Sequence, residues 1–189
     1  MRRTVIALLT GLLALTACST GGTGSSTSSA PASEADVVAW MDKVCGAVDG
    51  TVKAMSDEPN IDMTDPSKLK TGLSEWLDTL VTAVDKSIAD LKALENGPHP
   101  KSKELVSTAE EGMGQIRTLL GDTRSKVDSA TDSTQVVTAF TEMVTKAAAL
   151  EGAGAEVQKK LTETGLAQAA QKAGNCKGLA VVPTSPPTT

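Results

Sequence analysis

Apolar side chains recur along most of the chain at steps of three and four residues, which places them on one face of an α-helix. Four long segments follow this pattern, at about 33–58, 66–96, 102–128 and 135–161. No segment shows the strict alternation of apolar and polar residues that is typical of a β-strand. We therefore predict an all-α fold, an up-down-up-down four-helix bundle with a possible short fifth helix over residues 166–173.

Local signals indicate where these helices begin and end. Ser33 followed by Asp36 is a variant of the capping box, and Asp65-Pro66 offers a capping carboxylate followed by a proline at the first helical position. Gly97, in Asn96-Gly97-Pro98, suits a left-handed residue that ends the second helix. We expect Ser102 to cap the third helix.

Small residues interrupt the apolar stripes of the third and fourth predicted helices. The fourth stripe runs through Gly152-Ala153-Gly154, so we expect one long helix that is weakened there. Two interpretations of the small residues remain open, since they either let the helices pack closely or leave room for a cavity near Trp76. The residues concerned are Ala109, Gly112, Ala147 and Gly154.

The N-terminal segment has the layout of a secretory signal. Arg2 and Arg3 precede an apolar run over residues 5–15, which is too short to span a bilayer as a stable helix. Leu15-Thr16-Ala17-Cys18 resembles the lipobox of bacterial lipoproteins. The resemblance implies that Cys18 becomes the first mature residue and carries a diacylglyceryl group, with palmitate-type chains that hold the protein to the outer face of the cell membrane. The alternative is an ordinary secretory signal followed by a free thiol.

These features divide the chain into four parts. Residues 1–17 are the signal peptide and residues 18–32 a lipidated, flexible Ser/Gly/Thr linker, while residues 33–180 form the helical domain and residues 181–189 a disordered Pro/Thr tail. The composition, rich in Ala, Thr, Ser and Gly, resembles that of actinobacterial envelope lipoproteins.

If Cys18 is lipidated, Cys45 and Cys176 are the cysteines that remain. A secreted pair is expected to form a disulfide. This bridge would close a loop of about 130 residues, for which the chain-entropy model gives about 5 kcal/mol of stabilisation. Two unpaired buried thiols and a redox pair are the alternatives, although there is no Cys-x-x-Cys motif to support the latter.

Charge and composition argue against several classes of function. Removal of residues 1–17 changes the formal charge from −5 to −7 (16 basic against 23 acidic residues), and there is no Lys/Arg-rich run for nucleic acid. His99 is the single histidine, in a Pro-His-Pro turn, so neither a zinc nor a di-iron site is expected. We predict no catalytic residues, no metal and no cofactor.

We therefore expect a membrane-anchored extracytoplasmic lipoprotein with a non-enzymatic binding or scaffolding role, contacting an envelope protein or the cell wall. The alternative is a carrier or sensor of a small apolar ligand or lipid held between the helices.

Overall fold

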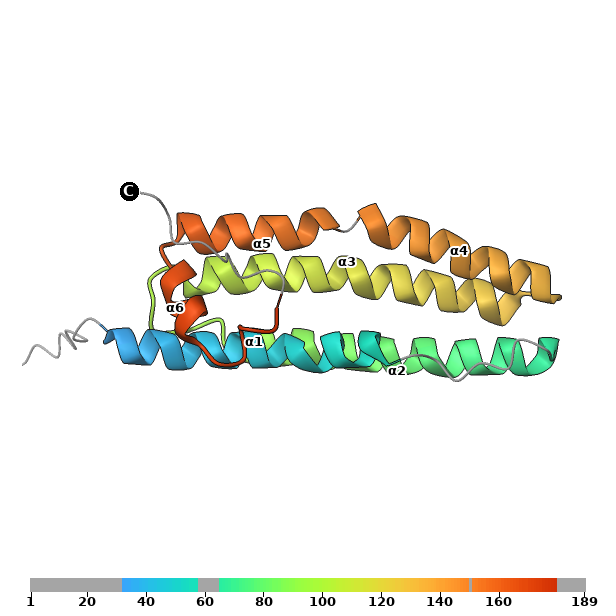
Figure 1. Ribbon diagram of the computed structural model, residues 1–189, viewed down its shortest axis with the longest axis horizontal. Helices are drawn as coiled ribbons and strands as arrows, with labels where there is room; N and C mark the ends of the chain where they lie inside the picture. The colour runs from blue at the N-terminus through green and yellow to red at the C-terminus, as the bar shows by residue number, and fades with distance from the viewer. Residues whose placement is uncertain (1–31, 58–64, 150, 180–189) are drawn as a thin grey trace, which may run out of the picture. The chain divides into compact units, whose positions relative to one another are not determined.

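Six helices make up the computed structural model, which describes residues 32–57, 65–149 and 151–179. All of these residues belong to one unit, residues 31–189. Across the described ranges the chain is helical or forms turns and bends, with no strand. The helices are α1 (Glu34–Ser56), α2 (Pro66–Ala93), α3 (Ser102–Ser129), α4 (Ser133–Ala149), α5 (Glu151–Glu163) and α6 (Ala167–Lys172) (Figure 1).

The predicted all-α, up-down-up-down bundle is confirmed. α2 packs between α1 and α3, α3 also packs along α4 and α5, and the short α6 lies against α1 (Figure 1). The fourth predicted helix corresponds to α4, which ends at Ala149, and α5, which begins at Glu151, while residue 150 between them lies outside the described residues. Gly152 and Gly154 fall in the first turn of α5, where each glycine costs about 1 kcal/mol relative to alanine.

Two of the three predicted helix starts are present. The Ser33 hydroxyl accepts a hydrogen bond from the Asp36 N–H at 3.2 Å, and the Asp36 carboxylate accepts the Ser33 N–H at 3.1 Å. At α2 the Asp65 carboxylate accepts the Ser67 N–H at 2.9 Å, and Pro66 is the first helical residue. These pairs satisfy N–H groups that have no partner within a helix.

The prediction of a left-handed Gly97 is wrong, because among the described glycines only Gly165 has a positive φ, 73°. Gly97 is required for a steric reason instead: a Cβ at this position would collide with the Trp40 indole and with the hydroxyl oxygen of Ser102. The indole N–H of Trp40 donates a hydrogen bond of 3.0 Å to the carbonyl oxygen of Leu94, the C-cap of α2. This contact fixes the end of α2 against α1.

Ser102 is the first residue of α3 rather than its cap, which is Lys101. The buried Ser102 hydroxyl accepts a hydrogen bond of 3.1 Å from the N–H of His99. The Nδ1 atom of His99 in turn accepts the Lys101 N–H at 3.2 Å. The serine and the histidine therefore hold the turn between α2 and α3.

The left-handed Gly165 ends α5. The Leu166 N–H donates to the Leu161 carbonyl at 2.9 Å, and the Gly165 N–H donates to the Thr162 carbonyl at 3.1 Å, which is the Schellman pattern. Only glycine adopts this conformation at no steric cost. The turn directs the chain into α6 and back toward α1.

Buried apolar residues form two clusters along the bundle. The first joins α1, the end of α2, the start of α3, α5 and α6, and the second joins α2, α3 and α4. Between α1 and α2 the buried hydroxyls of Thr51 and Ser87 form a hydrogen bond of 2.8 Å. The last apolar residues of the α1 stripe, Val52 and Met55, are 39% and 42% exposed, because the second cluster is built mainly without α1.

Candidate functional site

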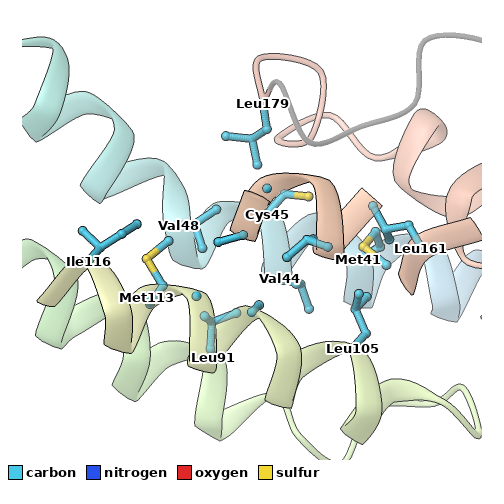
Figure 2. Close-up of a pocket in the computed structure, with 15 residues that line it drawn as sticks. Met41, Val44, Cys45, Val48, Leu91, Leu105, Met113, Ile116, Leu161 and Leu179 are labelled. Carbon is cyan, nitrogen blue, oxygen red and sulfur yellow. The ribbon is translucent and has the colours of Figure 1, made fainter. Parts of the chain in front are cut away.

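An apolar cavity of about 160 Å³ lies within the first cluster, between α1, α2, α3 and α5, and it is partly open to the surface. Figure 2 shows side chains from these helices converging on it, together with Leu179 from the segment after α6. The wall is made by Met41, Val44, Cys45, Val48, Leu91, Leu105, Ala109, Gly112, Met113, Ile116, Ala153, Gly154, Val157, Leu161 and Leu179.

Small residues on two facing helices create this space. Ala109 and Gly112 on α3 stand opposite Ala153 and Gly154 on α5, and a Cβ added at Gly112 would lie 3.6 Å from the Ala153 Cβ. Since there is no larger side chain at these positions, the interior between the two helices is not filled. Three of the four small residues singled out in the sequence thus line the cavity.

Ala147, the fourth, is exposed, and the cavity is not beside Trp76. The Trp76 ring packs against Phe140 in the second cluster, with centroids 6.2 Å apart, and its indole N–H donates to the Asp57 carbonyl at 3.3 Å. Trp76 is therefore a packing residue of the other half of the bundle.

The predicted disulfide joins Cys45 to Cys176 and forms part of the cavity wall. The two Cα atoms are 5.0 Å apart, across 131 positions of sequence. Both cysteines are buried, at 6% and 0% exposure. Beside the bridge, the Asn175 N–H donates to the Asp42 carboxylate at 2.8 Å. The C-terminal segment is thereby attached to α1, which brings Leu179 to the cavity.

An ion pair joins α3 to α5 beside two residues of the cavity wall, Leu105 and Leu161. The Glu104 carboxylate, adjacent to Leu105, accepts hydrogen bonds from the Nζ atoms of Lys160 at 2.8 Å and Lys101 at 2.9 Å. These two ammonium groups, Lys160 before Lys101, lower the pKa of Glu104 to about 2. The pKa of Lys160 is raised, chiefly by its hydrogen bond to Glu104. The pair therefore ties α3 to α5 beside the cavity wall.

The other candidate positions do not assemble a reactive centre in the described part of the chain. There, no three His, Cys, Asp or Glu side chains are grouped as metal ligands. Every cavity-lining side chain is apolar or part of the disulfide, so none of them is titratable. Cys18 and the predicted signal, linker and tail lie outside the described residues, except residue 32 of the linker.

Sequence reasoning missed part of the wall. Leu179 follows the last helix in a stretch without helical periodicity, so no pattern connected it with the core. Leu91 and Leu105 fit the apolar periods of the predicted helices over 66–96 and 102–128, but their position beside a cavity depends on which neighbours face them. The spacing of small residues on α3 and α5 was the one signal that pointed to this place.

None of the helices described here combines the length and the apolar character that crossing a membrane requires. Comparison of the chain with protein-family models, curated proteins and solved structures finds no match.

Proposed function

We propose that this protein binds a small apolar molecule between its helices, as a carrier or sensor, while a lipid on Cys18 holds it at the outer face of the membrane. The observation that carries this proposal is the cavity of about 160 Å³ with an apolar wall. An engineered protein cavity of about 150 Å³, also lined by apolar side chains, stays dry and binds benzene or xenon. A ligand that fills the cavity makes the van der Waals contacts that the wall residues lack while the cavity is empty.

The carrier role now ranks above the scaffolding role that the sequence favoured. A scaffold needs a contact surface, and the exposed large apolar side chains of the described residues are few: Val137 and Val144 on α4 lie two helical turns apart, and Val52 and Met55 form one small area on α1. Single exposed apolar residues are normal on protein surfaces. The proposed activity is non-enzymatic, because a wall without titratable or nucleophilic side chains supports binding and offers no group for acid–base or covalent chemistry.

The anchor is the second part of the proposal and rests on the lipobox-like Leu15-Thr16-Ala17-Cys18. Two or more acyl chains anchor a protein stably, whereas one chain does so only marginally. A linker of the predicted length reaches about 20 Å in root-mean-square terms, so the cavity would stay close to the bilayer. Incorporation of labelled palmitate into the wild type and its loss in Cys18→Ser tests the anchor, and an unlabelled wild-type protein would refute it.

Native mass spectrometry of the mature protein, isolated from the cells that make it, tests the ligand. Gly112→Leu places a side chain in the cavity, whereas Gly114→Leu on the same helix points into open space, since a Cβ there has no heavy atom within 4 Å. We expect a recurring non-covalent mass on the wild type and on Gly114→Leu, and its loss from Gly112→Leu. A clean apoprotein in all three samples would overturn the proposal.

A further inference from the structure

The cavity is long and narrow along the bundle. Its lining residues on α3 run from Leu105 to Ile116, which is about 16 Å at the helical rise of 1.5 Å per residue. On α1 they run from Met41 to Val48, about 10 Å by the same rise. A volume of about 160 Å³ inside a wall of this length, part of which the end residues themselves occupy, is an elongated slot.

The wall of this slot accepts hydrocarbon alone. None of its side chains carries an N–H or O–H group, and none has an aromatic ring on which a flat ligand could stack. A polar group placed there would lose its hydrogen bonds to water without replacement. The buried part of a ligand is therefore free of hydrogen-bonding groups, and any polar group lies outside, where the cavity is open.

The apolar stripe of α1 continues beyond the slot. Val48 lines the cavity, and Val52 and Met55 follow it on the same face, one and two turns later, partly exposed to solvent. A chain longer than the slot would meet further apolar surface in this direction. A compact ligand would make no use of it.

We propose that the cavity takes one unbranched alkyl or acyl chain, inserted along the helix axes, with the polar head of the molecule left outside. This inference rests on the proposed function and adds the shape and chemical class of the ligand. The lining chemistry requires that the buried part be hydrocarbon, and the slot length and the continuation along α1 favour a linear chain over a ring or a cage.

Calorimetric titration with primary alcohols from hexanol to dodecanol tests the proposal. The protein is the chain over residues 18–189 with Cys18→Ser, secreted so that Cys45 and Cys176 oxidise. We expect affinity to rise about fourfold for each added methylene until the slot is filled, and then to level off. 1-Decanol should bind about tenfold more tightly than 1-adamantanol, a compact cage with the same number of carbons.

Gly112→Leu should shift the levelling point to shorter chains, and Gly114→Leu should leave it unchanged. If Gly112→Leu does not fold, Gly112→Ala should lower the affinity for decanol without changing that for hexanol. Lysophosphatidylcholine with a chain of the same length as decanol distinguishes two sources of the ligand. Binding indicates a membrane lipid and rejection indicates a free amphiphile, and both results agree with a single alkyl or acyl chain in the cavity. Equal binding of cage and chain overturns this inference alone, while failure of every apolar probe overturns the proposed function as well.

Discussion

Gly112 on α3 faces Ala153 on α5, so closely that a Cβ added to the glycine would stand 3.6 Å from that of the alanine. This is an ordinary van der Waals separation, and it means that one methyl group fits without displacing α5. The cavity is therefore a consequence of residue size at a few positions, and single substitutions should fill it.

The first prediction concerns stability at this position. Gly112→Ala and Gly114→Ala should each raise the free energy of unfolding by up to about 1 kcal/mol, because alanine is the better helix former. Gly112→Ala should gain more than its control, since its methyl group also contacts Ala153. Urea unfolding followed by circular dichroism measures both values. A clear loss of stability in Gly112→Ala alone would mean that α3 and α5 already pack tightly.

Gly97→Ala should instead destabilise the protein by about 1–3 kcal/mol, because its methyl group would overlap the Trp40 indole and, to a lesser extent, the Ser102 hydroxyl oxygen. Gly50→Ala, in the exposed interior of α1 with no atom within 4 Å of the added Cβ, is the control and should be neutral or stabilising. The double variant Trp40→Leu/Gly97→Ala should cost less than the two single changes together. Additive losses would exclude the proposed overlap.

Removal of the disulfide should loosen the cavity wall as well as the fold. Cys45→Ala/Cys176→Ala is expected to lower the free energy of unfolding by about 2–5 kcal/mol, because the unfolded chain is no longer constrained. Guanidinium unfolding with and without a reductant checks this, since the reductant should affect the wild type and leave the double variant unchanged. Labelling of both thiols in the folded, non-reduced wild type would contradict the bridge.

The ion pair of Glu104 predicts a dependence of stability on pH. Its pKa in the folded protein, about 2, lies below the ordinary value of 4.5, so its contribution is present above pH 4.5 and is lost as the pH falls toward 2. Glu104→Gln should therefore be less stable than the wild type at pH 7, and the difference should shrink between pH 4.5 and pH 2. Thermal unfolding across this range measures it. A difference that is independent of pH would exclude the ion pair as its cause.

The features that the sequence predicted correctly depend on neighbours along the chain. The capping box at Ser33 and the Asp65-Pro66 start are set by residues within one helical turn, and the apolar periods are set by each helix itself. The pairing of Cys45 with Cys176 was predicted from the number of cysteines and from the resemblance of the N-terminal segment to a secretory signal.

The features that were missed or misplaced depend on contacts between distant segments. The glycine at position 97 is needed because of Trp40, 57 positions earlier in the chain, and not because of its own backbone angle. Ala147 was one of the four small residues for which close packing and a cavity both remained open, because residue size alone does not tell which neighbours a residue faces. Met143 is the last residue of α4 that is buried in the core, and the cavity lining contributed by α5 begins only at Ala153.

The most direct test of an apolar cavity that holds a linear chain is a crystal structure of the protein with a straight-chain alcohol that carries bromine at its far end. We predict continuous density between Leu105 and Ile116, with one anomalous bromine peak inside the bundle. A cavity filled by its own side chains, with the bromine peak absent from the interior, would contradict the account.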